Sequence, residues 1–401
     1  MNIALCLFRD QFSHVKPVER VLQGFFQFVY TEHWNTSEID RVKPDIVIGI
    51  NEHHAEISEC YHWARLKNIP TLTLQDGILE WRHIFENPLY NGITGAPLHQ
   101  PILADKMACI GLSSASLMLV WNNRNKIELT GMPKMDGILC SMSGGFKKGT
   151  GAKFTILILT SSKPWFDATQ KKIVLQQLKD IKSYLSERRD VEVIWRVTKE
   201  IPDLLGIENH YQSKSTEELS VLIQRVDAVI TTISTTILES QLLEKPVASI
   251  DYFNTPNFVY TRWSIRHKDH INSVVNEMMT VTSKDKQIQD SFLLQNIYIH
   301  PNFTAAQQVS ELIKRMVTYS KNDPGKILPF NMLGNLPQLE NRDPIVSSST
   351  YKVEEVNLVY ETILRYKMEN QKLKNQLQAR SWYGVAQVAM SKMKHLIFKS
   401  H

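Results

Sequence analysis

The alternation of short apolar runs with segments of helical period constrains the fold more than any other feature of this sequence. Apolar runs occupy residues 3–8 and 44–50, and a third begins at Thr71, directly after Pro70. Between the last two runs, residues 55–67 carry apolar side chains three or four positions apart, as one face of a helix does. A repeated strand–helix–strand order predicts an α/β fold with a parallel, helix-flanked sheet.

Three further segments complete the first α/β unit. Apolar residues recur at helical spacing over 18–29, which predicts a helix there. Residues 106–111 are predicted as a strand, and 126–136 contain a short strand, a turn at Gly131 and a stop at Pro133. Asp136 follows that stop, where its side chain could cap a helix.

The α/β pattern restarts after a glycine-rich stretch. Residues 143–151 contain four glycines and no apolar period, which is typical of a linker. Strands are then predicted at 154–160, 191–197, 228–232 and 246–250, with helices over 173–185 and 219–224. The predicted organisation is one α/β domain over 1–142, a second over 152–322, a cleft between them, and a C-terminal tail with helices over 323–401.

Charge and composition exclude several classes of protein. The chain has 46 basic and 41 acidic residues, and residues 351–401 contribute nine basic against four acidic, so the whole surplus of five lies there. A neutral body argues against a nucleic-acid binder. The sequence contains no run of eighteen apolar residues, so it predicts no membrane span. Its first residues are typical of a strand rather than a signal peptide. The four cysteines lack metal-ligand spacing, so we expect a reducing cytoplasm and no metal.

The stretch from Gln75 to Glu80 is the first candidate for chemistry. It follows the predicted Thr71 strand, and ligands of open α/β sheets bind outside the carboxyl ends of the strands. Asp76 would then be a carboxylate aimed into the cleft, with Glu80 one helical turn further along. The alternative is an ordinary strand-to-helix turn, because Asp-Gly is a common turn pair.

Three more residues are expected on the same side of the cleft. His53 and His54 follow the strand over 44–50, and Arg82 lies just beyond Glu80. Adjacent residues of an extended chain point to opposite faces, so the two histidines are poorly placed to share a metal ion. We expect them, with Arg82, to contact the acceptor substrate from loops.

The second unit carries a candidate anion site. Ser234, Thr235 and Thr236 lie between a predicted strand and a predicted helix, where free backbone N–H groups and hydroxyls can bind phosphate. Glu239, one turn further on, can reach a ribose or cap the helix. The alternative is that the hydroxyls only cap this helix.

Basic residues follow other strands of the second unit. Lys163, Arg196 and Lys199 are expected to meet the phosphate, and arginine offers a bidentate fork. Neither unit contains GxGxxG or GxxxxGK[ST], so a nicotinamide or P-loop site lacks its main support.

Three motifs carry a resemblance to known enzymes. Thr130-Gly-Met-Pro-Lys-Met-Asp136 resembles the Gly-x-Pro-Arg-x-Asp segment that ends the first domain of many GT-B glycosyltransferases and their epimerase relatives. Residues 231–247, with a Ser/Thr turn, Glu239 and Lys245-Pro246, are similar to their second-domain donor motif. Gln75-Asp-Gly-Ile-Leu-Glu80 resembles the Glu-Asp-Gly-Phe-Leu-Arg motif of bacterial retaining β-Kdo transferases of O-antigen and capsule synthesis.

The resemblance implies a GT-B fold of two Rossmann-like domains and a metal-independent enzyme without a cofactor. It implies transfer of β-Kdo (3-deoxy-D-manno-oct-2-ulosonic acid) from CMP-Kdo to a lipid-linked glycan, with retention of configuration. Retention can use a carboxylate nucleophile and two displacements, and Asp76 with acid/base help from Glu80 would supply them. The second domain would bind the nucleotide.

Two departures from the family motifs leave alternatives open. Glu80-Trp81 replaces Arg-Ser, and Val197-Thr-Lys-Glu200 stands where relatives often have His-Pro. A nucleotide-sugar 2-epimerase, or another GT-B transferase with a UDP or CDP donor, would share the fold. A non-catalytic scaffold of a polysaccharide assembly complex is the third class.

The tail has two amphipathic patterns. Residues 356–377 keep a heptad spacing with Asn370 at a core-type position, as in a coiled coil. Residues 382–399 place an apolar face among lysines, as helices at a membrane surface do. These patterns predict a coiled-coil partner or peripheral contact with the inner face of the cytoplasmic membrane. The alternative is that both helices pack on the protein's own domains.

Deleting residues 351–401 tests the membrane prediction. We expect the truncated protein to stay folded but to stop sedimenting with anionic liposomes, because each lysine near an anionic surface contributes about 1 kcal/mol. The full chain at low salt is the control. Loss of the folded state on truncation, or a full chain that ignores liposomes, would show that the tail packs on the domains.

Overall fold

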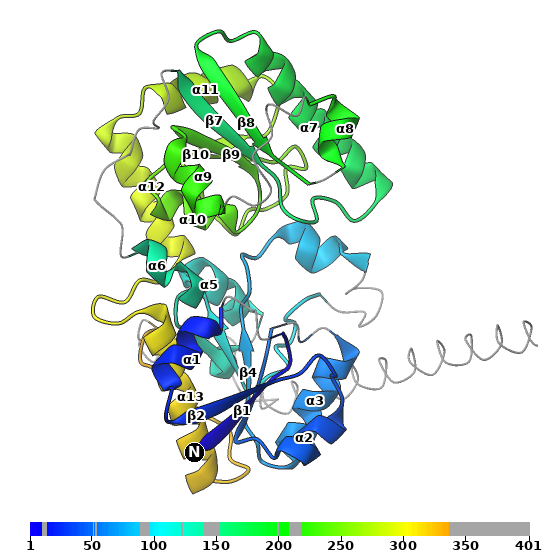
Figure 1. The fold of residues 1–401 in the computed structure, drawn as a ribbon, viewed down its shortest axis with the longest axis vertical. Coiled ribbons are helices and arrows are strands. Elements are labelled where there is room, and N and C mark those ends of the chain that lie inside the picture. Colours follow the sequence, from blue (N-terminus) through cyan, green and yellow to red (C-terminus); the bar gives the residue numbers. More distant parts are fainter. Residues whose placement is uncertain are drawn as a thin grey trace, which may run out of the picture.

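The computed structural model describes residues 1–9, 14–50, 52, 54–88, 97–121, 123–139, 153–198, 200–207 and 218–336. The predicted linker over 143–151, both tail patterns, His53 and Lys199 lie outside these ranges. The described residues form two α/β units, one above the other in Figure 1, each a parallel sheet with helices on both faces. This architecture confirms the predicted fold class.

The first unit is built on six parallel strands in the order β2-β1-β3-β4-β5-β6. Their bounds are β1 (Asn2–Cys6), β2 (Phe26–Tyr30), β3 (Ile46–Gly49), β4 (Thr71–Leu74), β5 (Lys106–Cys109) and β6 (Ile127–Leu129). The helical segments are α1 (Lys16–Leu22), α2 (Thr36–Val42), α3 (Ala55–Leu66), η1 (Arg82–Glu86), α5 (Leu112–Val120), η2 (Arg124–Lys126), η3 (Pro133–Met135) and α6 (Asp136–Leu139).

Alternation along the strands supplies two apolar layers, one on each face of this sheet. Ile46 and Ile48 of β3 pack in the layer under α1, whereas Val47 packs in the layer under α2 and α3. Every residue of β3, β4 and β5 is buried, as expected for parallel strands covered on both faces.

The predicted helix over 18–29 is wrong in its second half. Helix α1 ends at Leu22, Gly24 adopts a φ of +85°, and the edge strand β2 begins at Phe26. Phe25, which fits the helical spacing, is 59% exposed. A short apolar run can follow either period by chance, and glycine with positive φ permits the turn that separates the two elements.

The second unit has five parallel strands in the order β11-β10-β9-β7-β8. Their bounds are β7 (Phe154–Leu159), β8 (Val191–Arg196), β9 (Ala228–Thr232), β10 (Val247–Ile250) and β11 (Trp263–Ile265). The helices are α7 (Ala168–Ser186), α8 (Ile201–Leu205), α9 (Leu219–Arg225), α10 (Thr236–Leu242), α11 (His270–Met279), α12 (Ser283–Asn296) and α13 (Ala305–Asn322).

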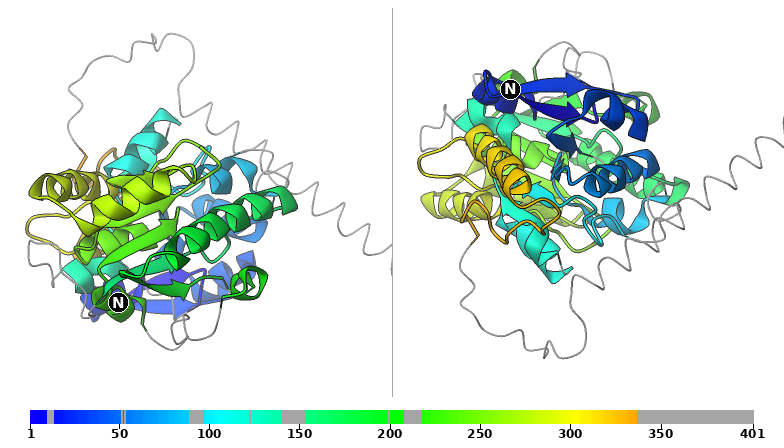
Figure 2. Two further views of the ribbon diagram at one scale, coloured as in Figure 1. Left: turned by 90° about the horizontal axis from the view of Figure 1, so that it is seen from above. Right: turned by 90° about the horizontal axis from the view of Figure 1, so that it is seen from below.

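Helix α13 returns to the first unit, although it lies inside the range 152–322 expected for the second domain. Its buried face, which includes Val309 and Ile313, packs with α1 and the first sheet, and Figure 2 shows it against that unit from below. Asp136 accepts hydrogen bonds from the N–H groups of Ala305 and Ala306, both at 2.9 Å. Asp136 therefore bonds the first N–H groups of a helix that begins 169 residues away and whose N-cap residue is Thr304.

A buried ion pair holds the segment that follows α13. Lys106 Nζ lies 2.7 Å from Glu128 Oε1, and both side chains have no exposed surface. Lys106 also donates to the carbonyl of Pro329, and Glu128 accepts from the N–H groups of Met332 and Leu333. Because unpaired charges are costly to bury, these bonds fix residues 329–333 against β5 and β6.

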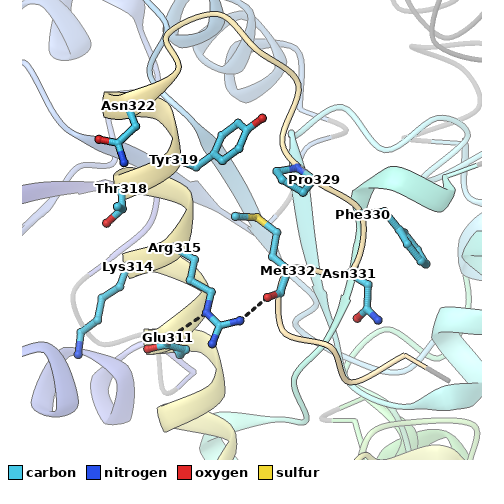
Figure 3. Close-up of a pocket in the computed structure, with 10 residues that line it drawn as sticks. All are labelled: Glu311, Lys314, Arg315, Thr318, Tyr319, Asn322, Pro329, Phe330, Asn331 and Met332. Carbon is cyan, nitrogen blue, oxygen red and sulfur yellow. Dashed lines mark hydrogen bonds and ion pairs between the residues drawn. The ribbon is translucent and has the colours of Figure 1, made fainter. Parts of the chain in front are cut away.

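A surface cavity of about 590 Å³ lies between α13 and this segment (Figure 3). Its lining comes from residues 311–322 and 329–332, and Arg315 bonds both Glu311 and the carbonyl of Met332 beside it. None of these residues belongs to the loops after the strands. The cavity is therefore separate from the predicted cleft.

Replacing Asp136 by alanine tests the importance of the returning helix. We expect the free energy of unfolding to fall by about 1–2 kcal/mol, because two N–H groups at the start of α13 lose a charged acceptor. Urea denaturation measures the change. Glu311→Ala, which removes an exposed ion pair on the same helix, is the control and should change stability by less than about 1 kcal/mol; equal effects of the two variants would contradict the assignment.

Candidate functional site

The turn after β4 is fixed by a buried glutamine. Gln75 accepts a hydrogen bond from the Ile110 N–H at 2.9 Å, and its amide donates to the Gly77 carbonyl at 2.8 Å and to Ser114 Oγ at 2.9 Å. These bonds use the whole amide group, so Gln75 ties the turn to β5 and α5. The turn then presents Asp76 as its next side chain.

Asp76 is accessible to solvent, yet protein lies close around it. Desolvation raises the pKa of its carboxyl above the usual value, while the charges of His99 and Lys134 act in the opposite direction. The side chain itself is exposed. A reachable carboxyl group with a raised pKa is a common property of functional sites.

The Asp76 turn touches the second unit. Ile78 N–H donates to Thr235 Oγ1 at 3.4 Å, and a Cβ at Gly77 would lie 3.0 Å from the same hydroxyl oxygen. The structure therefore brings together Asp76, predicted as a catalytic residue, and Thr235, predicted as a nucleotide-binding residue.

Arg82 joins the two units a few residues further on. It is buried, and its Nη1 donates to the Pro164 carbonyl at 2.9 Å while its guanidinium lies 4.1 Å from the ring centre of Phe253. Its Nε lies 2.5 Å from Glu80 Oε1. Arg82 therefore bridges the two units and pairs with Glu80, and its expected contact with the acceptor stays a prediction.

Glu80 is not one helical turn beyond Asp76, which corrects the sequence prediction. Residues 75–80 form no helix, and the helical turn starts only at η1. Burial raises the pKa of Glu80 to about 6, with Asp251 and Glu86 adding to the rise and Arg82 opposing it. A carboxyl group with such a pKa can donate or accept a proton near neutral pH.

The hydroxyl cluster at the start of α10 does not cap the helix, so the capping alternative is wrong. Thr235 is the N-cap residue but makes no capping hydrogen bond with its side chain. Instead Thr231 Oγ1 lies 3.3 Å from Ser234 Oγ and 3.0 Å from Thr236 Oγ1, and the last two oxygens are 2.5 Å apart. The hydroxyls thus form a compact group where β9 ends.

The remaining predicted residues have different surroundings. Glu239 pairs with Lys134 of the first unit at 3.3 Å. Lys163 is exposed, and its charge lowers the pKa of both His54 and His83, although burial is the larger cause for each histidine. Arg196 ends β8 and is half-buried.

One buried pair near Asp76 was missed by sequence reasoning. His99 Nδ1 lies 2.8 Å from Glu52 Oε1, with 7% and 2% of the two side chains exposed. Asp251, buried at the end of β10 with a pKa raised by desolvation, was also missed. Glu52 follows β3 directly, and this position after a strand was the only available signal.

Metal sites and membrane-spanning helices are both absent from the part of the chain that the structure describes. No group of three or more His, Cys, Asp or Glu side chains in these ranges is placed to hold a metal ion. No helix within them is long and apolar enough to cross a membrane.

Comparison with known proteins identifies the fold. No protein-family model and no curated protein matches the sequence. Among solved structures, the chain is similar to S. aureus MnaA with UDP (TM-score 0.55, 14% identity, covering 82% of this chain and 100% of that one). It is also similar to UDP-GlcNAc 2-epimerase from Neisseria meningitidis bound to UDP-GlcNAc (0.55, 13%, 78% and 100%), and to the wall teichoic acid polymerase TagF soaked with CDPG (0.51, 12%, 80% and 90%). The two units therefore have the GT-B-like arrangement of these enzymes.

The titration of Glu80 can be measured directly. We expect its side-chain carboxyl carbon to titrate with a midpoint near 6 by NMR, and Arg82→Gln to move the midpoint higher, because a lowering charge is lost. Since the folded pKa exceeds the ordinary 4.5, this group stabilises the fold at low pH, and that contribution is lost as the pH rises from 4.5 to about 6. Glu80→Gln assigns the signal, and a midpoint at 4.5 would refute a desolvated carboxyl.

Proposed function

We propose that this protein is a GT-B glycosyltransferase that moves β-Kdo from CMP-Kdo to a lipid-linked glycan of O-antigen or capsule synthesis, with retention. The observation that carries the proposal is the contact between the Asp76 turn and Thr235, because it joins a reachable carboxylate to the hydroxyl cluster. The solved structures with UDP, UDP-GlcNAc or CDPG bound support a nucleotide-linked donor.

The nucleotide belongs on the second unit in this proposal. Ser234 and Thr236 offer hydroxyl groups, and the first N–H groups of α10 lie beside them. Lys163, Arg196 and Lys199 supply the positive charge that a leaving phosphate requires. Glu239, which pairs with Lys134, lies in the first turn of α10 and would bind a ribose hydroxyl.

The chemistry follows from the two carboxyl groups. Asp76 attacks the anomeric carbon as the bond to the phosphate breaks, which releases CMP and leaves the sugar on the Asp76 oxygen. Glu80 acts as the acid/base group during this step, since its pKa of about 6 allows both protonation states near neutral pH. Attack by the acceptor hydroxyl on the opposite face then restores the original configuration.

A nucleotide-sugar 2-epimerase is the second candidate. It is supported by solved structures described as UDP-GlcNAc 2-epimerases, such as the one from Neisseria meningitidis. Incubation with UDP-GlcNAc discriminates between them, because an epimerase changes the sugar without an acceptor. A protein that binds neither CMP nor UDP would instead fit a scaffold role.

The hydroxyl cluster can be tested by binding. We expect Thr235→Ala combined with Thr236→Ala to weaken CMP binding by roughly 1–3 kcal/mol, the scale of hydrogen bonds lost to a charged group. Isothermal titration calorimetry measures the affinity. Thr318→Ala, an exposed threonine on α13, serves as the control, and an unchanged affinity of the double variant rules out this site.

Asp76→Ala tests the nucleophile. We expect no transfer from CMP-Kdo, with CMP binding and the folded state intact, because the Asp76 side chain is exposed and Gln75 holds the turn through its own amide group. Mass spectrometry of the products measures transfer. Near-wild-type turnover would assign Asp76 to the turn only, and activity of the wild type should persist in EDTA.

A further inference from the structure

A buried carboxylate holds the ring of His99 in one orientation. Glu52 Oε1 lies 2.8 Å from His99 Nδ1. The other oxygen, Oε2, accepts hydrogen bonds from Thr73 Oγ1 at 3.1 Å, from Leu103 N–H at 3.0 Å and from Ala104 N–H at 3.3 Å. The two carboxylate oxygens of Glu52 therefore have different partners: Oε1 faces the His99 ring, and Oε2 accepts the other three hydrogen bonds.

These partners determine which ring nitrogen carries the proton. Burial alone would raise the pKa of Glu52, but the hydrogen bond and charge of His99 and the Ala104 N–H lower it below the usual value. An ionised carboxylate only accepts hydrogen bonds, so Nδ1 must donate. In the neutral ring, Nε2 is then the nitrogen with an available lone pair.

His99 lies where the proposed reaction takes place. Its partner Glu52 bonds Thr73 of β4, three positions before Asp76, so the pair lies beside the strand that leads into the Asp76 turn. The N–H of Leu98 donates to the carbonyl of Ile84 in η1, which connects the His99 segment to the element that carries Arg82. The backbone at His99 has a φ of +61°, and Asn123 Nδ2 donates to its carbonyl at 3.0 Å.

We propose that His99 is the base that activates the acceptor, with Glu52 as its positioning residue; this inference rests on the proposed function. In the second displacement, a lone pair of the acceptor oxygen forms a bond to the anomeric carbon. The bond from that carbon to the Asp76 oxygen breaks, and its electron pair returns to the carboxylate. The hydroxyl proton passes to Nε2 of His99.

Glu80 and His99, the two proposed proton-transfer groups, are held by different partners. Glu80 is held at 2.5 Å by Arg82, and Arg82 in turn contacts Pro164 and Phe253 of the second unit. His99 is held by Glu52, which also bonds Thr73 of β4, the strand that leads into the Asp76 turn. A carboxyl near the donor side and an imidazole near the nucleophile fit the first and second displacement respectively.

His99→Gln should uncouple the two displacements. With CMP-Kdo and a glycan acceptor, we expect the first release of CMP to continue while transfer falls about 100-fold or more, the scale of lost general base catalysis. The sugar–Asp76 adduct should accumulate and be visible by intact-protein mass spectrometry. Azide should restore turnover, because this nucleophile needs no deprotonation.

Glu52→Gln tests the positioning role. Three donors face Oε2, so the amide oxygen takes that place and the amide NH₂ faces Nδ1 of His99. We expect the ring proton to move to Nε2, which ¹⁵N NMR of the histidine ring detects, and transfer to fall as in His99→Gln with CMP release retained. Glu59→Gln, an exposed residue of α3, should change neither readout.

The outcomes separate the inference from the proposed function. Transfer by His99→Gln within about threefold of the wild type would overturn the inference alone, since a lost base costs far more. A wild-type ring with its proton on Nε2 would also overturn it, whatever the reaction. If the wild type releases no CMP from CMP-Kdo and forms no adduct, the proposed function fails and the inference fails with it.

Discussion

Two backbone N–H groups at the start of α13, both bonded to the carboxylate of Asp136, fix the point at which the chain returns from the second unit to the first. The chain crosses from α12 back to the first unit just before this point, and Tyr298 N–H bonds to the Ile110 carbonyl at 2.8 Å on the way. At Gly131 a side chain is excluded, because a Cβ would lie 2.6 Å from the Tyr298 carbonyl oxygen and the φ is +81°. The segment from Gly131 to Asp136 therefore contacts the returning chain at both of its ends, at Tyr298 and at the start of α13.

Contact between the two units brings residues of both to the candidate site. An apolar cluster that includes Met132, Ile233 and Ile297 packs residues of both units against one another. Once these surfaces are in contact, the turn after β4 meets the turn after β9, and Arg82 reaches Pro164. Thr235 and Glu239, both predicted to bind the nucleotide, are therefore each in contact with the first unit, at Gly77 and Lys134 respectively.

Sequence reasoning succeeded where the signal was local and periodic. The helix predicted over 55–67 corresponds to α3, and the run from Thr71 corresponds to β4, because burial on defined faces leaves a period in the sequence. It failed over 18–29, where Val21 and Phe25 fit a helical period but are exposed. Local pattern also predicted that Asp136 caps a helix, but it could not indicate which one.

Pairs that form across the fold left no such pattern. Glu52 and His99 are separated by 47 positions and meet only because residues 97–105 pass over the sheet beside β4. The Ser/Thr cluster was open to a capping interpretation because a hydroxyl at a helix start normally bonds that helix. Thr235 instead bonds the first unit, and nothing within residues 231–239 encodes that partner.

The buried pair Lys106–Glu128 also fixes the place on the first unit where residues 329–336 lie. With residues 329–333 fixed by these charges, Asn335 bonds the carbonyl of Leu129, the last residue of β6, and Leu336 packs in the first core. The chain therefore leaves the first unit from a fixed point at the carboxyl end of an edge strand, on the side that faces the second unit. Whatever residues 337–401 bind is held within a radius measured from that point, at most about 3.3–3.6 Å per residue of chain.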